Sequence, residues 1–359
     1  MLVVNKSFQQ DSYTVILEVT ETSKDLRLDQ FLQLYLSSLS REFIKNKIKA
    51  KDVLILGRPG NLRPATRVLK GERVQLFIQR SHEEDEYWNG QQLTLQKDPF
   101  VIFEDNNIIV ISKPPYMTTH PTGRHLFYCA TVYFENIHKH MIHSIHRIDR
   151  ETSGILLLGK NPATANILST EFENNHVKKV YFFIAKKRPR PSEYATFHAN
   201  ERMGPLDDGP KRVFIHAFPE SSQQGKEAKT YFEIFWQNQD YALGLAFPVT
   251  GRQHQIRVHA STHGLPLVGD KLYLGNYPMF QRFKDHAATH EDHAFMELPR
   301  QALHAMALKI TYQNNPRLFL SPLPYDLCTW IQNKLHLEVE PIEKEIERRI
   351  MSRIDGMPT

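Results

Sequence analysis

Near the middle of the chain stands the stretch His146-Arg147-Ile148-Asp149-Arg150-Glu151-Thr152-Ser153-Gly154, which leads at once into the apolar run Ile155-Leu156-Leu157-Leu158. A short, continuous apolar run is typical of a strand in the interior of a sheet. The Asp149 carboxylate lies between two arginines, and a neighbouring positive charge favours the ionised form of a carboxylate. An ionised, positioned aspartate can act as a nucleophile or as a base. The alternative interpretation is an ordinary Arg-Asp turn before a buried strand.

A second distinctive stretch lies further along the chain. It reads Phe247-Pro248-Val249-Thr250-Gly251-Arg252-Gln253-His254-Gln255-Ile256-Arg257-Val258-His259. This stretch contains two arginines, Arg252 and Arg257, and two histidines, His254 and His259. A basic amphipathic strand or helix is the alternative interpretation, but such an element would not require all of these residues together.

Two further segments carry polar groups on expected strands. Residues 178–185 are rich in β-formers and include Tyr181. A tyrosine can stack on a nucleobase and offer its hydroxyl, although a tyrosine half buried on a strand is the simpler interpretation. Lys113 ends a second expected strand, just before the rigid Pro114-Pro115 turn, and by residue type alone it is an ordinary surface lysine.

Length and composition favour a globular protein of about two domains. The chain has 359 residues, of which 41% are hydrophobic and 24% charged. No apolar run reaches the roughly 18 residues of a membrane span, and the first residues do not resemble a signal peptide. The two cysteines, Cys129 and Cys328, form neither a disulfide framework nor a Cys-x-x-Cys metal pair. We therefore expect a cytoplasmic protein.

Positive charge is concentrated in one part of the chain. Residues 24–80 contain thirteen Lys or Arg and five Asp or Glu, a net charge of +8, whereas the whole chain carries +5. Such a concentrated basic surface is typical of a nucleic-acid-binding module. A solvated helix face is the alternative explanation for the basic run between Arg41 and Lys51.

The basic segment also shows a clear pattern of short elements. Residues 12–19 predict a strand, and Leu28, Phe31 and Leu32 have helical spacing. Ser40 is the expected N-cap of a second helix that runs from about Arg41 to Ala50. On that helix the apolar residues expected to face a core are Phe43, Ile44 and Ile48. Residues 53–56 and 74–78 predict two more strands.

Taken together, the motifs resemble the signature sequences of the RluA-type pseudouridine synthases. That family has His-Arg-Leu-Asp-x-x-Thr-Ser-Gly where this chain has residues 146–154, with Ile148 in place of Leu. Residues 250–259 resemble its Thr-Gly-Arg-x-His-Gln-Leu/Ile-Arg-x-His motif, and residues 264–270 and 303–305 continue the similarity. Residues 178–185 resemble its strand containing Lys-x-Tyr. Lys113 and the following turn resemble its Lys-Pro-x-Gly, with Tyr116 where the family usually has Gly.

The resemblance implies an enzyme that isomerises uridine in structured RNA without a metal or an organic cofactor. It implies that Asp149 is the essential catalytic residue, that Arg257 keeps it charged and aimed, and that Tyr181 lies against the target base. The sequence does not separate attack at C1′, attack at C6 and removal of a proton from C2′. In each case the base must first be flipped out of the RNA, at a cost of a few kcal/mol.

The resemblance also implies a set of RNA contacts. Arg147 would fill the space that the flipped base leaves, since its planar cation can stack and bind phosphate. Arg252 would lie nearer the RNA backbone, and Lys113 would be a structural or phosphate-side group. The residues expected to contact RNA are Arg147, Arg252, His146, Lys113, Arg41, Lys45, Lys47 and Lys49. Ribosomal large-subunit RNA is the expected substrate ahead of tRNA, and a monomer is expected.

The basic segment itself resembles the small RNA-binding module named after ribosomal protein S4. The matching residues are 26–32, Ser40-Arg41, Ile44, 47–49 and 69–72. We therefore expect an α+β protein whose catalytic domain contains a long mixed, largely antiparallel sheet flanked by helices. The expected organisation is an N-terminal extension or strand (1–22), the S4-like module (23–80), an acidic linker (81–97), the catalytic domain (98–335) and a charged C-terminal helix or tail (336–359).

Three other functions were compared with this one. A kinase is excluded because Asp does not directly follow His146-Arg147 and no Gly-rich phosphate loop is present. The histidine groups at 138–146 and 286–293 lack the spacing of known metal motifs, so no metal site is expected. A non-catalytic RNA-binding factor acting on ribosomes or tRNA is the remaining alternative. Asp149 argues against it, because a pure binder gains nothing from a carboxylate beside phosphates.

Overall fold

The computed structural model describes residues 3–8, 12–36, 39, 41–80, 85–121, 125–189, 195–206 and 213–356. These residues form two compact units. The first unit comprises residues 1–86 and 118–142, and the second comprises residues 87–117 and 143–359. The first boundary lies in the expected linker. Residues 118–142 are grouped with the first unit, and the catalytic-domain bounds 98–335 stay a prediction. None of the described helices has the length and apolar character needed to cross a membrane.

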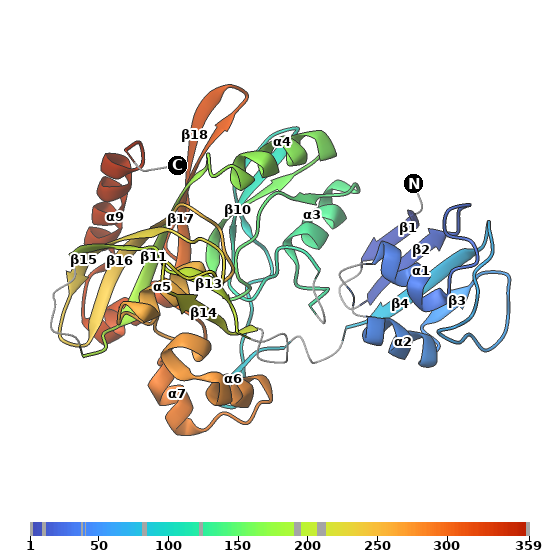
Figure 1. Cartoon of the computed structure of the whole chain (residues 1–359), viewed down its shortest axis with the longest axis horizontal. Helices are drawn as coiled ribbons and strands as arrows, with labels where there is room; N and C mark the ends of the chain where they lie inside the picture. The colour runs from blue at the N-terminus through green and yellow to red at the C-terminus, as the bar shows by residue number, and fades with distance from the viewer. Residues whose placement is uncertain are drawn as a thin grey trace. The chain divides into compact units, whose positions relative to one another are not determined.

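The first unit is a small sheet packed against helices (Figure 1). Its elements are β1 (Val3–Phe8), β2 (Ser12–Glu18), α1 (Leu28–Tyr35), α2 (Arg41–Lys49), β3 (Val53–Ile55), β4 (Arg73–Gln79) and α3 (Ala130–His138). The strands are antiparallel in the order β1-β2-β4-β3. Alternate residues of β2 are buried, because successive side chains of a strand point to opposite faces.

Both predicted helices and all three predicted strands of the basic segment are present. Ile44 and Ile48 of α2 are buried in the core with Phe31 of α1, and Phe43 is half-buried against it. The expected N-cap, Ser40, lies outside the described residues. The helical spacing of these apolar residues was therefore sufficient to predict α1 and α2.

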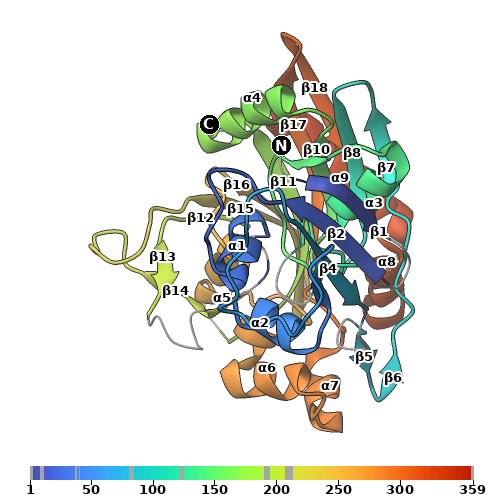
Figure 2. The same ribbon diagram turned by 90° about the vertical axis from the view of Figure 1, so that its right-hand side faces the viewer.

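The second unit is built on one long sheet. Its strands are β7 (Phe100–Glu104), β8 (Ile108–Lys113), β9 (His143–Ser144), β10 (Ser153–Gly159), β11 (Lys178–Lys186), β12 (Thr196–Ala199), β15 (Thr230–Gln237), β16 (Tyr241–Pro248), β17 (Leu303–Tyr312) and β18 (Asn315–Leu320). The order is β12-β15-β16-β11-β17-β10-β8-β7, with β18 on β17 and β9 on β10. Figure 2 shows the central strands following one another in this order. Within the described residues only β10 and β17 run parallel, so the predicted mixed, largely antiparallel sheet is confirmed.

Shorter elements complete the second unit. The helices are α4 (Pro162–Glu173), α5 (Gln255–Thr262), α6 (Tyr277–Lys284), α7 (His290–Met296), α8 (Tyr325–Trp330) and α9 (Val339–Arg353), with π-helical turns η3 (Lys271–Gly275) and η4 (Ile331–Leu335). Two small hairpins join β5 (Tyr87–Trp88) to β6 (Gln91–Gln92) and β13 (Arg202–Pro205) to β14 (Ile215–Phe218). Trp88 stacks on Phe283 at 5.9 Å, so this part of the expected linker is packed onto the helices.

The C-terminal segment is a packed helix, a point that the sequence left open. Ile342, Ile346 and Ile350 of α9 are buried in the core cluster that also contains Phe182 and Leu243 of the sheet. Figure 1 shows α9 beside β15, β16 and β11. Spacing of four residues places the three isoleucines on one side of the helix. A single apolar residue per turn explains why the sequence pattern was weak.

The strand that follows the charged turn lies deep in this sheet. All seven residues of β10 are buried, and β10 pairs with β17 on one side and β8 on the other. At the start of β10, Gly154 has φ +104°, and a Cβ there would come within 2.3 Å of the Ala305 carbonyl oxygen. Only glycine fits such a position, so the Ser-Gly of the motif allows β10 and β17 to approach each other directly after the charged turn.

Candidate active site

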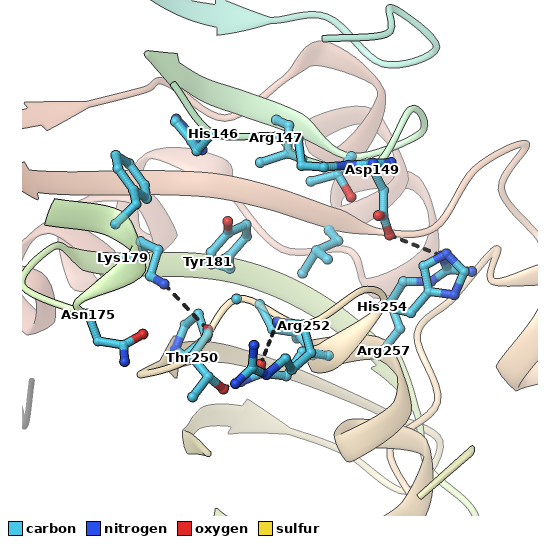
Figure 3. Close-up of a pocket in the computed structure, with 18 of the residues that line it drawn as sticks. His146, Arg147, Asp149, Asn175, Lys179, Tyr181, Thr250, Arg252, His254 and Arg257 are labelled. Atoms are coloured by element: carbon cyan, nitrogen blue, oxygen red, sulfur yellow. Dashed lines mark hydrogen bonds and ion pairs between the residues drawn. The ribbon is translucent and has the colours of Figure 1, made fainter. Parts of the chain in front are cut away.

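Asp149 lies on the turn that precedes β10, at the wall of a cavity of about 410 Å³. The Thr152 amide donates to the Asp149 carbonyl at 3.0 Å and closes the turn. The Asp149 side chain is 24% exposed, so it is accessible although the strand that follows is buried. The cavity is also lined by Arg147, Arg252 and Arg257, which makes the surroundings of the carboxylate strongly basic (Figure 3).

Arg257 connects Asp149 to a second, fully buried carboxylate. Arg257 Nη1 donates to Asp149 Oδ2 at 3.0 Å, while Nε and Nη2 donate to the two oxygens of Asp270 at 2.7 and 2.8 Å. Asp270 Oδ1 also accepts from the backbone amides of Leu272 and Tyr273 and so caps η3. This two-point contact fixes the plane of the guanidinium, and therefore the direction from which it meets Asp149.

The charges in this group keep Asp149 ionised. Burial alone would raise the pKa of Asp149, but its electrostatic interactions with the His254 ring and the Arg257 guanidinium hold the pKa below its usual value. Burial lowers the pKa of His254 to about 4, so its ring is neutral near pH 7 and Arg257 is the effective cation there. Burial would lower the pKa of Arg257, but Asp270 and Asp149 together raise it.

The two oxygens of Asp149 have different surroundings. Oδ2 accepts from Arg257 and, at 3.4 Å, from the side-chain amide of Gln301. Gln301 also donates to the Thr152 hydroxyl at 3.2 Å. Within the described residues Oδ1 accepts no hydrogen bond. One oxygen is therefore held by the protein while the other keeps its lone pairs available for a bound molecule.

Tyr181 lies on β11 and lines the same cavity (Figure 3). Burial first, and the charge of Asp149 second, raise the pKa of Tyr181 above its usual value. The side chain therefore stays a neutral phenol that can donate a hydrogen bond and present its ring to a planar ligand. The structure thus brings together the three predicted catalytic residues from three separate segments of the chain.

Three of the predicted RNA-contacting residues also line this cavity. Arg147 is exposed. Arg252 is exposed as well, and its Nε donates to the Glu227 carbonyl at 2.9 Å. His146 is held more firmly: its Nε2 accepts from the Leu157 amide at 3.0 Å and its ring stacks on Phe172 at 4.3 Å. Burial lowers the pKa of His146 to about 3, so it offers a neutral ring rather than a charge.

Lys113 lies in the protein interior rather than on the surface. It is fully buried, and its ammonium donates to the carbonyl oxygens of Pro114 at 2.9 Å, Met117 at 2.8 Å and Arg150 at 3.1 Å. Burial lowers its pKa well below the usual value. These contacts favour the structural role of Lys113 over the phosphate-side role. Lys113 instead ties the turn after β8 to the turn that holds Asp149.

The remaining residues that were predicted to contact RNA lie on α2 in the first unit. They differ in whether a carboxylate already pairs with their charge. Arg41 donates to the buried Asp29 at 3.1 Å, and Lys47 donates to Asp52 at 2.9 Å. Lys45 and Lys49 form no ion pair with any described residue. These two lysines are therefore the ones on α2 whose charges are not already engaged by a carboxylate.

Sequence reasoning gave no role to several residues that shape the site. Asp270 ends a segment of the family-like pattern, 264–270, but only the structure shows that it locks Arg257. Gln301 precedes β17 and carries no motif of its own. Lys179 lies on β11 two residues before Tyr181, and its Nζ lies 3.3 Å from the Thr250 carbonyl oxygen (Figure 3). Its spacing from Tyr181, which places both on one face of the strand, was the available signal.

Comparison with known proteins identifies the family. Residues 107–262 match the RNA pseudouridylate synthase family. The uncharacterized RNA pseudouridine synthase YjbO of Bacillus subtilis is 31% identical over 244 residues, which cover 66% of this chain and 76% of that protein. Ribosomal large subunit pseudouridine synthase D of Nitrosomonas europaea is 27% identical over 333 residues, 90% of this chain and 89% of that protein.

A solved structure agrees at the level of the fold. Human RNA pseudouridylate synthase domain containing 4 superposes with a TM-score of 0.52 at 22% identity, covering 67% of this chain and 94% of that chain. The motifs, the basic cavity around a held aspartate and these comparisons lead to the same assignment. The chain belongs to the RluA-type family of RNA pseudouridine synthases and is an isomerase.

Proposed function

We propose that this enzyme converts a specific uridine of ribosomal large-subunit RNA into pseudouridine, with Asp149 as the essential residue. The observation that carries the proposal is the arrangement of Asp149: Oδ2 is held at 3.0 Å by an arginine that Asp270 locks, and Oδ1 is free of protein donors among the described residues. The large-subunit substrate is supported by the name and the near full-length similarity of the Nitrosomonas europaea relative.

The chemistry suits these groups. The reaction breaks the bond between N1 of uracil and C1′ of ribose, turns the base and joins C5 to C1′. C5 loses one proton and N1 gains one, so atoms and electrons balance without an oxidant. Asp149 Oδ1 is the atom that would attack C1′ or C6, or remove the C2′ proton. Tyr181 would support the uracil ring as it turns, since a phenol ring stacks on a base irrespective of its orientation.

Access to the target base requires that it leave its helix. Flipping a base costs a few kcal/mol of lost stacking and pairing. Arg147 is exposed at the rim of the cavity and is suited to occupy the vacated space. Arg252 and the neutral ring of His146 would contact the displaced strand on either side.

We place the main RNA anchor on the first unit, in the S4-like module formed by α1, α2 and the sheet. Its net charge of +8 over residues 24–80 supports electrostatic binding of phosphates. Lys45 and Lys49 are the expected contacts, because their charges are not neutralised by a described partner.

Removing these two charges should change the salt dependence of binding. In Lys45→Gln/Lys49→Gln we expect RNA affinity to fall about tenfold and the slope of log K against log salt to flatten by about 1.5, since each phosphate contact contributes about 0.7–0.9. Fluorescence anisotropy with a labelled large-subunit RNA fragment at several salt concentrations measures both. The matched control is Lys24→Gln/Lys70→Gln, which removes two lysines paired with Glu21. An unchanged slope in Lys45→Gln/Lys49→Gln would show that this face of α2 does not contact RNA phosphates.

The pH dependence of RNA binding should follow the protonation of Lys179. Burial lowers the pKa of Lys179 to about 8, so the ammonium is charged at pH 7 and loses its proton as the pH rises through 8. We expect affinity for a labelled single-stranded RNA to fall on the order of threefold between pH 6.5 and 8.5, the effect of about one phosphate contact. Lys179→Gln should bind weakly at both pH values. A wild-type profile that stays flat would show that this ammonium does not face the RNA.

Two alternatives make different predictions in one experiment. Pseudouridines are mapped in large-subunit RNA and in tRNA from cells that lack the gene, complemented by the wild type or by Asp149→Asn. The proposal expects a site in large-subunit RNA that returns only with the wild type. A pseudouridine that returns in tRNA instead would show that tRNA is the substrate. Restoration by Asp149→Asn would show that Asp149 is not essential, and the absence of a site from both RNAs would contradict the proposed substrate.

We also expect the enzyme to work as a monomer in the cytoplasm. The three proposed catalytic residues of one chain all line the same cavity, which supports a site that needs no residue from a second copy. Cys129 and Cys328 are free thiols, which supports a reducing compartment.

A further inference from the structure

A second cavity of about 350 Å³ lies next to the one that contains Asp149. The two cavities share Lys179 and Pro248 in their walls. The second cavity lies where β11 begins and β16 ends, and α9 closes it with Ser352 and Arg353. A chain bound in the first cavity could therefore continue into the second around Lys179.

Aromatic rings form one side of this second cavity. His198 on β12 is the cross-strand partner of Tyr231 on β15, which in turn is the partner of Phe247 on β16. The ring of Tyr231 lies 5.0 Å from that of His198 and 5.6 Å from that of Phe247. Exposure decreases along this row, since His198 is exposed, Tyr231 half-buried and Phe247 buried. The outer two rings can therefore receive a planar group, while Phe247 supports them from the core.

The charged groups that line the second cavity are all basic. Lys178, Lys179 and Arg353 contribute to its wall, and no acidic side chain does so among the described residues. Arg353 Nε lies 3.2 Å from Glu233, but its side chain is 50% exposed and its terminal nitrogens bond to no described residue. Lys178 Nζ donates to the Asp355 carbonyl at 2.8 Å, a contact that leaves two of its protons available.

We propose that the second cavity binds the nucleotide next to the target uridine on the same RNA strand. Its base would lie against Tyr231 and His198, and its phosphate between Lys178 and Arg353, with Lys179 at the step between the two cavities. The inference rests on the proposed function, because it places the target uridine in the first cavity. The cavity offers aromatic rings on which a base can stack and, beside them, cations that can bind a phosphate. This combination fits a nucleotide better than a peptide or a hydrocarbon chain.

The C-terminal helix forms one wall of the second cavity. α9 lies outside residues 107–262, which match the family. Its packing through Ile346 and Ile350 fixes the position of Arg353 against β15. The flanking nucleotide would thus contact a segment that is separate from the shared catalytic motifs. This contact makes α9 a determinant of substrate choice.

The test compares a ligand that fills one cavity with a ligand long enough for both. Uridine 5′-monophosphate and the trinucleotide UpUpU are titrated into the full-length protein by calorimetry. We expect the wild type to bind UpUpU at least about tenfold more tightly, and Lys178→Gln/Arg353→Gln to lose most of that gain while binding the mononucleotide as before. His198→Ala should lose about fivefold for UpUpU, the order of one weak stacking contact. Thermal unfolding verifies that each variant is folded.

A matched control removes two charges from the same helix away from the cavity. Lys344→Gln/Arg348→Gln deletes two basic residues whose partners are Glu340 and Glu345 on the helix surface. It should keep the full trinucleotide gain. The proposal is overturned if the wild type binds both ligands equally, or if the control loses as much as the cavity variants. Turnover by Asp149→Asn with the trinucleotide gain intact would instead overturn the catalytic assignment and leave the second cavity in place.

Discussion

Asp149→Asn is expected to lose at least about 10⁴-fold of pseudouridine formation while it keeps its fold and its RNA affinity. The amide has the shape of the carboxylate but neither its charge nor its second oxygen. Arg257 remains bonded to Asp270 at 2.7 and 2.8 Å, so no buried charge is left uncompensated by the change. Nucleoside analysis of digested RNA after single-turnover incubation measures the loss, and anisotropy measures the binding.

Asp149→Ala serves as the companion variant. It should be as inactive as Asp149→Asn, because both lack the carboxylate that we propose acts on the nucleotide. Activity within tenfold of the wild type in either variant would exclude Asp149 as the group that acts on the nucleotide. Loss of RNA binding in both would instead show that Asp149 organises the binding surface.

Arg257→Met is expected to destabilise the protein by about 3–5 kcal/mol, because the fully buried Asp270 carboxylate loses its partner. Activity should also fall by at least about 10²-fold, since Asp149 loses the donor that aims it. Chemical denaturation measures the free energy of unfolding, and single-turnover kinetics measures the activity. The variant alone cannot separate the two effects, so a second substitution is needed.

Arg257→Met/Asp270→Asn separates stability from positioning. The asparagine oxygen can still accept from the Leu272 and Tyr273 amides, as Asp270 Oδ1 does at 3.1 Å, but no charge is left buried. We expect most of the lost stability to return while activity stays low. Recovery of activity together with stability would show that Arg257 serves folding only, and that Asp149 needs no partner to act.

The sequence was most informative where residues lie on a regular element. The alternation in β2 and the spacing of Ile44 and Ile48 depend on local periodicity, and the structure agrees with both. The encounter of Asp149 with Arg257 was predicted from family resemblance, since no local pattern relates residues so far apart. Asp270 was missed for the same physical reason: its importance lies in a contact made only after the sheet and η3 have formed.

Lys113 shows why a polar residue at a strand end is hard to interpret. A lysine after an apolar strand normally reaches solvent. Here the turn folds back and places the carbonyl oxygens of Pro114 and Met117 around the ammonium, while Arg150 supplies a third from another turn. Tyr116 adopts φ +68° within the turn after β8. That backbone conformation is one that glycine adopts readily, which is consistent with the glycine that the family usually has there. The sequence showed the departure at Tyr116 but not the buried lysine that depends on the turn.

Release of tritium from large-subunit RNA labelled at C5 of uridine reports the chemical step itself, because C5 exchanges its hydrogen for the bond to C1′. RNA from cells lacking the gene is incubated with the purified enzyme and with Asp149→Asn. We expect the wild type to release one tritium for each pseudouridine formed and Asp149→Asn to release none above background. Equal release by both proteins, or binding of the RNA without any release by the wild type, would contradict a mechanism in which the Asp149 carboxylate, held by Arg257, acts on a flipped uridine.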